Sequence, residues 1–102
     1  MDLGLKGKVV MVSGASRGIG RAIVLGFADE GCRLSLCARG KEGIDRVAQE
    51  VQKTGAEVTA LVGDVTNEAD ARRWVEETQQ RFGRVDIVVN NVGGSRPGVL
   101  GP

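Results

Sequence analysis

The chain has 102 residues, of which 41% are apolar and 26% are charged, and its formal net charge is +1. This length predicts one domain with a modest core, and a nearly neutral chain lacks the basic surface that binds nucleic acid. The apolar runs fall far short of the ~20 residues that cross a bilayer, and the N-terminus lacks the pattern of a secretory signal. We therefore expect a cytoplasmic protein that binds neither nucleic acid nor a membrane.

The first part of the chain predicts a strand followed by a helix. The apolar run at 8–13 (KVVMVS) is continuous enough to be a strand buried on both faces. After it, Ile19, Ile23 and Phe27 recur every four residues, which predicts an apolar helix face. Gly31 follows this pattern and is expected to end the helix.

The middle of the chain repeats this alternation. A strand is predicted at 33–38 (RLSLCA) and another at 57–62 (EVTALV). Between them lies a helical pattern that ends near Gly55. Its apolar face, at i, i+3, i+4 and i+7, consists of Ile44, Val47, Ala48 and Val51.

A last helix and strand follow. Asn67 offers an N-cap and Asp70 an early acid, and the helix is expected to end at Gly83. Its predicted face consists of Ala71, Trp74, Val75, Thr78 and Phe82. The run at 85–90 (VDIVVN) predicts a fourth strand.

Seven alternating elements predict an α/β fold with a doubly wound parallel sheet of the Rossmann type. A parallel return needs a crossover of a dozen or more residues, so the helices cover both faces of the sheet. In such a sheet the four strands take the order 3-2-1-4. We expect residues 1–92 to form a dinucleotide-binding half-domain, and residues 93–102 (GGSRPGVLGP) to form a loop or a disordered tail.

Cys32 and Cys37 are five residues apart in a predicted strand. That spacing separates their Cα atoms by more than a disulfide spans. Two cysteines without any histidine also cannot supply the ligands of a metal site. We expect two free thiols in the core.

The stretch 13–20 (SGASRGIG) places three glycines between the first strand and its helix. A strand that enters a helix through such a loop aims unpaired N–H groups and the positive end of the helix dipole at one point, where anions bind. Gly14 would allow the tight turn, Gly18 the close approach of a pyrophosphate, and Gly20 the close packing of helix against strand. The spacing departs from G-x-G-x-x-G, and no Gly-Lys-Ser/Thr ending marks a nucleoside triphosphatase loop. A merely tight turn is the alternative interpretation.

A second stretch is expected to meet this loop. In the order 3-2-1-4 the first and fourth strands are adjacent where the winding reverses, and ligands bind outside the carboxyl ends of the strands there. Residues 13–20 leave the first strand, and residues 90–94 (NNVGG) leave the fourth. Two separate pieces of sequence therefore converge on one crevice.

These motifs resemble those of the short-chain dehydrogenases/reductases over the whole length of the chain. The family's TGxxxGxG motif matches residues 13–20, with Ser13 in place of threonine. Its NNAG motif matches residues 90–93, with Val92 in place of alanine, and its Asp-Val pair matches residues 64–65. The resemblance implies the N-terminal, cofactor-binding half of such an enzyme, cut in the loop after the fourth strand.

The resemblance also implies a set of cofactor-binding residues, in which Asp64 meets the adenine amino group. Two simpler interpretations stay open: Asp64 as a turn or capping residue, and Asn90 as a strand-end residue that ties down neighbouring backbone. The predicted set is Ser13, Gly14, Ser16, Arg17, Gly18, Ile19, Gly20, Ala38, Arg39, Asp64, Val65, Asn90, Val92 and Gly93.

The end of the second predicted strand indicates which cofactor is bound. Selection of NAD commonly uses an acid there, whereas NADP requires that acid to be absent and cations to be present. Ala38 stands about where the family's aspartate would be, Arg39 follows it, and Arg17 can reach the same side. Two guanidinium groups suit a phosphate dianion, so the pattern resembles that for NADP(H). A solvated loop arginine is the alternative for Arg39.

The resemblance implies catalysis by a tyrosine whose pKa a neighbouring lysine lowers. The chain contains no tyrosine, and the stretches that carry the family's catalytic serine and helix asparagine lie beyond Pro102 in family members. Without histidine, a Ser-His-Asp triad is excluded as well. We therefore predict no catalytic residue in this chain.

The expected function is that of an NADP(H)-dependent oxidoreductase of carbonyl or alcohol substrates. The chain would be its cofactor-binding portion and would form a homo-oligomer. The alternative is a non-catalytic nucleotide-binding module or a truncated gene product.

Overall fold

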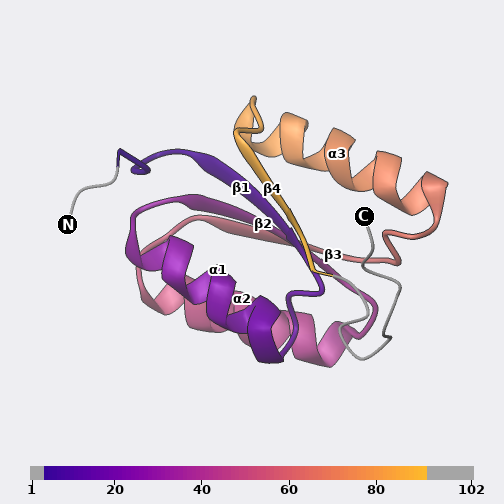
Figure 1. The fold of residues 1–102 in the computed structure, drawn as a ribbon, viewed down its shortest axis with the longest axis horizontal. Coiled ribbons are helices and arrows are strands. Elements are labelled where there is room, and N and C mark those ends of the chain that lie inside the picture. The colour runs from indigo at the N-terminus through magenta and orange to yellow at the C-terminus, as the bar shows by residue number, and fades with distance from the viewer. Residues whose placement is uncertain (1–3, 92–102) are drawn as a thin grey trace.

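The computed structural model describes residues 4–91, in which strands and helices alternate as the sequence predicts (Figure 1). All strand pairs are parallel and the order is β3-β2-β1-β4, which confirms the doubly wound fold. None of the helices within this range is long and apolar enough to cross a membrane. The elements are β1 (Val9–Ser13), α1 (Gly18–Asp29), β2 (Arg33–Ala38), α2 (Lys41–Lys53), β3 (Val58–Val62), α3 (Glu68–Phe82) and β4 (Ile87–Asn90).

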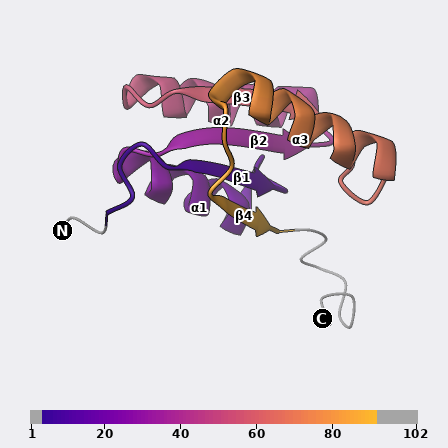
Figure 2. The same ribbon diagram turned by 90° about the horizontal axis from the view of Figure 1, so that it is seen from above.

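The helices lie on both faces of the sheet. Helices α1 and α2 pack side by side below it in the view of Figure 1, and α3 packs above it. Figure 2 shows the strands next to each other, with β3 and β4 at opposite edges of the sheet. β1 lies inside the sheet, and all five of its residues are buried, as predicted.

Two apolar clusters hold the layers together. The larger lies between the sheet and the helices α1 and α2, and it includes Val10, Val12, Leu34, Leu36, Val24, Ile44, Val47 and Val51. The smaller lies under α3 and consists of Met11, Cys37, Leu61 and Trp74. Successive residues of β1 and β2 point to opposite faces, so each strand contributes to both clusters.

Helix α1 is rotated relative to the predicted face. Ile19 is 71% exposed, and the buried row is Gly20, Val24 and Ala28. A Cβ on Gly20 would lie 1.9 Å from the carbonyl oxygen of Gly14, so the face that begins with Gly20 is the one that packs against the loop and the sheet. Ile23 and Phe27 pack only at the rim of the larger cluster.

Helix α3 follows the sequence prediction except at one residue. Asn67 caps it by accepting a hydrogen bond of 3.0 Å from the backbone N–H of Asp70, and Gly83 ends it in the left-handed conformation. Trp74, Thr78 and Phe82 are buried. Val75 was predicted on the same face but is 41% exposed, because it follows Trp74 by 100° around the helix.

A buried polar network joins α3 to β2. The indole Nε1 of Trp74 donates a hydrogen bond of 2.9 Å to Ser35 Oγ, which lies 2.6 Å from Thr78 Oγ1. Thr78 Oγ1 in turn donates to the carbonyl oxygen of Trp74. Buried hydroxyls require such partners, so this network fixes where α3 lies along the sheet.

Cys32 and Cys37 are both free and buried, as expected from their spacing. Cys37 lies in the smaller cluster, where its Sγ is 3.6 Å from the carbonyl oxygen of Gly63. Burial raises the pKa of the Cys37 thiol to about 11. This thiol is therefore protonated at neutral pH.

Candidate functional site

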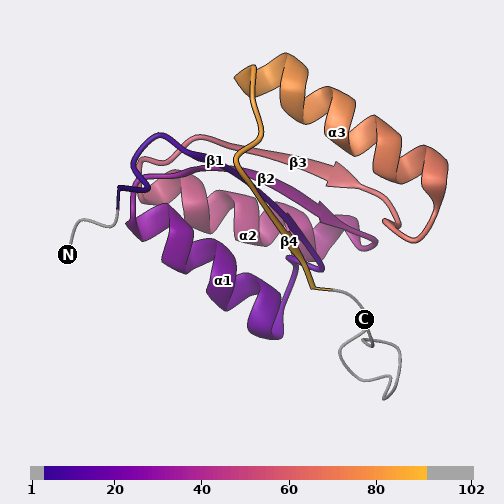
Figure 3. The ribbon, with the colours of Figure 1, turned by 45° about the horizontal axis from the view of Figure 1, so that its top comes forward.

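The carboxyl ends of β1 and β4 lie side by side, as the strand order predicts. Ser13 and Asn90 are register partners, and Ser13 Oγ donates a hydrogen bond of 2.8 Å to Asn90 Oδ1. Ser13 is fully buried, whereas Asn90 is exposed. Figure 3 shows β4 ending beside the turn that leads from β1 into α1.

The glycine loop leaves no space for a side chain at Gly14 or at Gly20. Gly14 has a φ of 60°, and a Cβ there would lie 1.8 Å from the carbonyl oxygen of Asn91. Asn91 Nδ2 donates a hydrogen bond of 3.3 Å to the carbonyl oxygen of Gly14. The backbone N–H of Ala15 donates to the carbonyl oxygen of Cys37 at 3.4 Å, which links the loop to β2. The loop is thus held between β4 and β2.

Gly18 differs from the other two glycines of the motif. Its φ is also 60°, but a Cβ there would meet no heavy atom within 4 Å. It is the first residue of α1, whose N-cap, Arg17, provides no capping side chain, and no acid lies in the first turn. Open space therefore lies beside an uncapped helix N-terminus, where backbone N–H groups and the helix dipole favour an anion.

The end of β2 carries positive charge next to this loop. Ala38 is the last residue of β2 and is buried, while Arg39 and Arg17 are both exposed. Neither arginine is in an ion pair among the described residues. The nearby Lys41 is paired with Asp45, their charged atoms being 2.5 Å apart.

Ser16, in the glycine loop, lies against the start of α2. A Cβ on Gly43 would be 3.0 Å from Ser16 Cβ. Gly40, the N-cap of α2, provides no capping side chain. The loop and the start of α2 therefore border the same region beyond the carboxyl ends of β1 and β2.

Asp64, after β3, forms a turn of its own. Its Oδ1 accepts hydrogen bonds from the backbone N–H of Thr66 at 2.9 Å and from Thr66 Oγ1 at 2.6 Å. These bonds, with a smaller contribution from Arg39, hold the pKa of the Asp64 carboxyl below its usual range. The turn-forming role of Asp64 is present, and it leaves the second carboxylate oxygen available. Val65, next to it, packs partly buried against the smaller cluster.

The structure thus brings most of the predicted residues to the end of the sheet at which the carboxyl ends of the strands lie. Ser13, the glycine loop and Asn90 are in direct contact through the bonds above, and Ala38, Arg39, Asp64 and Val65 follow the neighbouring strands β2 and β3. Ile19 lies in the first turn of α1 with its side chain exposed. The predicted Val92 and Gly93 lie outside the described residues.

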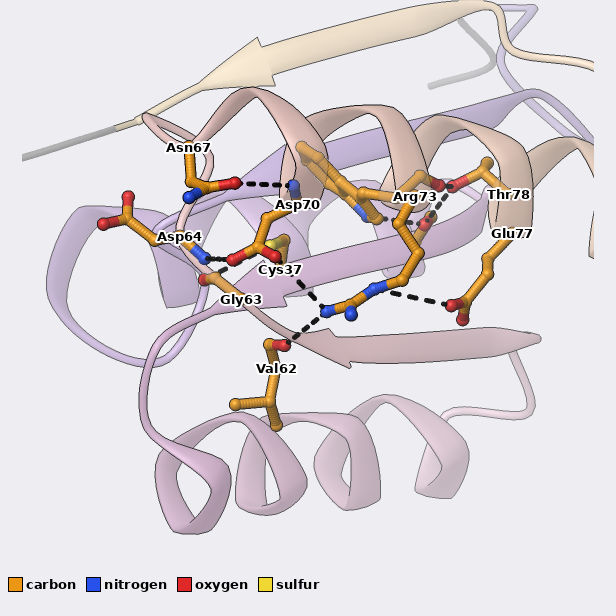
Figure 4. Close-up of polar contacts among 11 residues, drawn as sticks. Cys37, Val62, Gly63, Asp64, Asn67, Asp70, Arg73, Glu77 and Thr78 are labelled. Carbon is orange, nitrogen blue, oxygen red and sulfur yellow. Dashed lines mark hydrogen bonds and ion pairs between the residues drawn. The ribbon is translucent and has the colours of Figure 1, made fainter.

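The sequence analysis did not assign two further residues to this end of the sheet, Asn91 and Asp70. Asn91 holds Gly14 from the β4 side, and the second Asn of NNVGG was its signal. Asp70 was interpreted only as an early helix acid, but its Oδ2 accepts a hydrogen bond of 2.9 Å from the backbone N–H of Asp64 (Figure 4). No sequence pattern distinguishes these two uses of a first-turn aspartate.

A cavity of about 350 Å³ lies at the opposite end of the sheet, with Lys6, Gly31 and Thr54 in its lining. It faces the amino ends of the strands. Ligands of doubly wound sheets bind at the carboxyl ends, so this cavity is not the candidate site.

Comparison with known proteins gives consistent results. The short chain dehydrogenase family model matches residues 8–101. An L-fucose dehydrogenase of Rattus norvegicus is 45% identical over 92% of this chain. An 11-beta-hydroxysteroid dehydrogenase-like protein of Arabidopsis thaliana is 39% identical over 85% of it. The chain covers 33% and 29% of these two proteins, which is about a third of their length.

Solved structures match as well. L-sorbose reductase from Gluconobacter frateurii, complexed with NADPH and L-sorbose, superimposes with a TM-score of 0.88 at 39% identity, over 91% of this chain and 36% of that one. A short chain dehydrogenase/reductase from Burkholderia phymatum in complex with NAD has a TM-score of 0.80 at 30% identity, over 82% of this chain and 30% of that one. Proteins with this fold therefore bind either nicotinamide cofactor.

Proposed function

Because this chain belongs to the short chain dehydrogenase family, we propose that it binds NADP(H) where the carboxyl ends of β1 and β4 meet. The observation that carries the proposal is the open space at Gly18 beside the uncapped N-terminus of α1. A pyrophosphate is an anion that needs close backbone approach and free N–H donors. Both are available at this position.

The residues around this space have complementary roles. Gly14 and Gly20 keep the loop close to β4 and α1, and the Ser13–Asn90 hydrogen bond fixes the two strand ends. The backbone N–H groups of the loop, including those of Ser16 and Ile19, would hold the pyrophosphate. Asp64 and Val65 would border the adenine, and Val92 and Gly93 are proposed to continue the site. When bound, the nicotinamide would exchange a hydride with a carbonyl or alcohol substrate.

The choice of NADP(H) over NAD(H) rests on the end of β2. An acidic residue there would bind the ribose 2′-OH and repel a phosphate, but Ala38 cannot do either. Arg39 follows β2 directly and Arg17 lies in the glycine loop, and both are exposed, without an ion pair among the described residues. Both guanidinium groups are therefore free to make charge-assisted hydrogen bonds to a 2′-phosphate.

Replacement of Arg39 tests this preference. Arg39→Ala should weaken NADPH binding by about 1.5 to 3 kcal/mol, as expected for hydrogen bonds to a charged group, and leave NADH binding nearly unchanged. Lys41→Ala is a matched control, since it removes a nearby cation that is already paired with Asp45. Equal losses for NADPH and NADH in Arg39→Ala would contradict the assignment.

We propose further that the whole protein is an oxidoreductase of a small carbonyl or alcohol compound and a homo-oligomer. The names of the relatives, an L-fucose dehydrogenase and an L-sorbose reductase, support a substrate of this class. The 102 residues themselves contain no tyrosine to act as the proton donor. We therefore expect this chain to bind the cofactor without turnover, and carbonyl reduction by the purified chain with NADPH would contradict that expectation.

A nucleotide-binding module without catalysis is the second candidate. The lack of tyrosine favours it for this chain taken alone. The intact mass of the source protein distinguishes the two. A chain about three times as long, like the relatives, favours the enzyme, and a mass of 10.7 kDa favours the module.

A further inference from the structure

The turn between β3 and α3 is built around the carboxylate of Asp70. Its Oδ2 accepts the hydrogen bond of 2.9 Å from the backbone N–H of Asp64. A Cβ on Gly63 would lie 3.3 Å from the same oxygen. The carboxylate is therefore in close contact with two consecutive residues of this turn.

Arg73 lies three residues after Asp70 in α3 and contacts the beginning of the turn between β3 and α3. Its Nη2 donates a hydrogen bond of 3.3 Å to the carbonyl oxygen of Val62, the last residue of β3. The same nitrogen lies 3.6 Å from Asp70 Oδ1, and Nε lies 3.9 Å from Glu77 Oε2. Asp70 and Arg73 thus fix both sides of residues 62–64, as Figure 4 shows.

The position of α3 is itself fixed by buried contacts. Trp74 and Thr78 join it to Ser35 in the middle of β2. Asp70 lies one turn before Trp74, so its carboxylate is presented to the β3 turn by a helix that cannot shift without breaking this network. The chain of contacts runs from β2 through α3 to the backbone of Asp64.

The side chain of Asp64 is in turn constrained on one side only. Its Oδ1 accepts two hydrogen bonds from Thr66. Among the described residues, Oδ2 has no hydrogen-bond partner. Figure 4 shows the carboxylate of Asp64 directed away from Asp70, while the backbone N–H points toward it. Asp70 therefore sets the direction of Asp64 without occupying its free oxygen.

We propose that Asp70 is a positioning residue that selects adenine: by holding the backbone of Asp64, it aims the free carboxylate oxygen at the amino group of the bound base. This inference rests on the proposed function, because it concerns the adenine end of the same cofactor site. Asp70 itself would not touch the ligand. Its effect would appear as selectivity for one base over another.

Nicotinamide hypoxanthine dinucleotide phosphate is a suitable probe of this selectivity. Hypoxanthine has a carbonyl oxygen where adenine has the amino group, so at this position it offers Asp64 an acceptor in place of a donor. The experiment measures the Kd of this chain for reduced NADP and for its hypoxanthine analogue by titration. We expect the chain to prefer adenine about tenfold, which corresponds to one hydrogen bond to a charged group.

Three variants separate positioning from general stability. Asp70→Ala should bring the ratio of the two Kd values close to one. Asp70→Asn keeps an oxygen that accepts from the N–H of Asp64 and should keep the ratio within about twofold of the original. Glu68→Ala is the matched control: it removes another acid from the first turn of α3, and within residues 4–91 this acid is paired with Arg72 alone. Its ratio should be unchanged.

The outcomes are distinct. If both ligands weaken equally in Asp70→Ala and the ratio persists, Asp70 only stabilises the fold and the inference is wrong. The inference also fails if Glu68→Ala lowers the ratio as much as Asp70→Ala does. If the unaltered chain binds neither dinucleotide, the proposed function fails and the inference fails with it. Thermal unfolding of each variant shows whether the fold is retained.

Discussion

The hydroxyl of Ser13, fully buried at the end of β1, donates a hydrogen bond of 2.8 Å to the side-chain oxygen of Asn90 at the end of β4. These residues are 77 positions apart in the chain and are register partners in the sheet. β4 pairs with β1 only, since it lies at the edge of the described sheet. The bond therefore joins the glycine loop to the strand that completes the candidate site.

The two partners should contribute unequally to stability. Ser13→Ala removes one hydrogen bond and should cost about 1 kcal/mol, because exposed Asn90 can turn to water. Asn90→Ala leaves the buried hydroxyl of Ser13 without its partner and should cost about 1 to 3 kcal/mol. Urea unfolding of both single variants and the double variant measures this. The double variant should be no less stable than Asn90→Ala, and a strictly additive loss would contradict the coupling.

The glycines of the loop should fall into two groups. Gly14→Ala and Gly20→Ala place a Cβ 1.8 and 1.9 Å from backbone oxygens, so each should cost more than about 3 kcal/mol of folding stability. Gly18→Val meets no heavy atom within 4 Å but carries the strain of a side chain at a φ of 60°, so it should lose nucleotide binding before it loses the fold. Circular dichroism combined with NADPH fluorescence titration distinguishes the groups.

An internal glycine of α1 gives the control. Gly26 is exposed, and a Cβ there would meet nothing within 4 Å. Gly26→Ala should raise stability by up to about 1 kcal/mol through helix propensity, with unchanged binding. Normal cofactor binding by Gly18→Val would contradict the phosphate-binding role of the loop.

The sequence was sufficient for the fold because periodicity reports directly on burial. Continuous apolar runs identified the strands, and the i, i+3, i+4, i+7 pattern of α2 identified its three buried residues and the partly buried Ala48. The prediction failed for α1, where the row Gly20, Val24 and Ala28 is buried and apolar Ile19 is exposed. Apolar periodicity cannot register a face that is buried because its residues are small.

The candidate site was predictable to a smaller extent. Motifs located the loop and the strand ends, since glycine spacing depends on backbone conformation. The hydrogen bond from Asp64 to Asp70 was not predictable, because a first-turn aspartate suits the helix dipole equally well without that contact. Side-chain partners depend on the tertiary placement of α3, which no local pattern encodes.

The thiols should be protected in the folded chain. Cys37 is fully buried and its pKa is raised from 9.0 to about 11, so it should resist alkylation at pH 8 and react on unfolding. A raised pKa in the folded state adds stability that is fully present below the unfolded pKa and is lost as the pH rises through the folded one. Stability should therefore fall between about pH 9 and pH 11. Cys37→Ser should reduce this fall, and rapid alkylation of the native chain would contradict the burial.

The edge of the sheet should promote association. Val88, in β4, is 61% exposed in an apolar strand, and an unpaired apolar edge is a template for another chain. Light scattering should give a mass above the 10.7 kDa of one chain, and Val88→Lys should shift it toward that value. Val75→Lys, which adds the same charge to an exposed position of α3, is the control. A well-behaved monomer before any substitution would contradict the edge argument.

The most direct test of the cofactor site is an amide chemical-shift titration of this chain with NADP⁺. We expect the largest shifts at the amides of Gly14, Gly18 and Gly20, with further shifts at Arg39 and Asn90. Shifts confined to Lys6, Gly31 and residues 54–57, which line the cavity at the opposite end of the sheet, would contradict it. So would the absence of any shift at saturating cofactor.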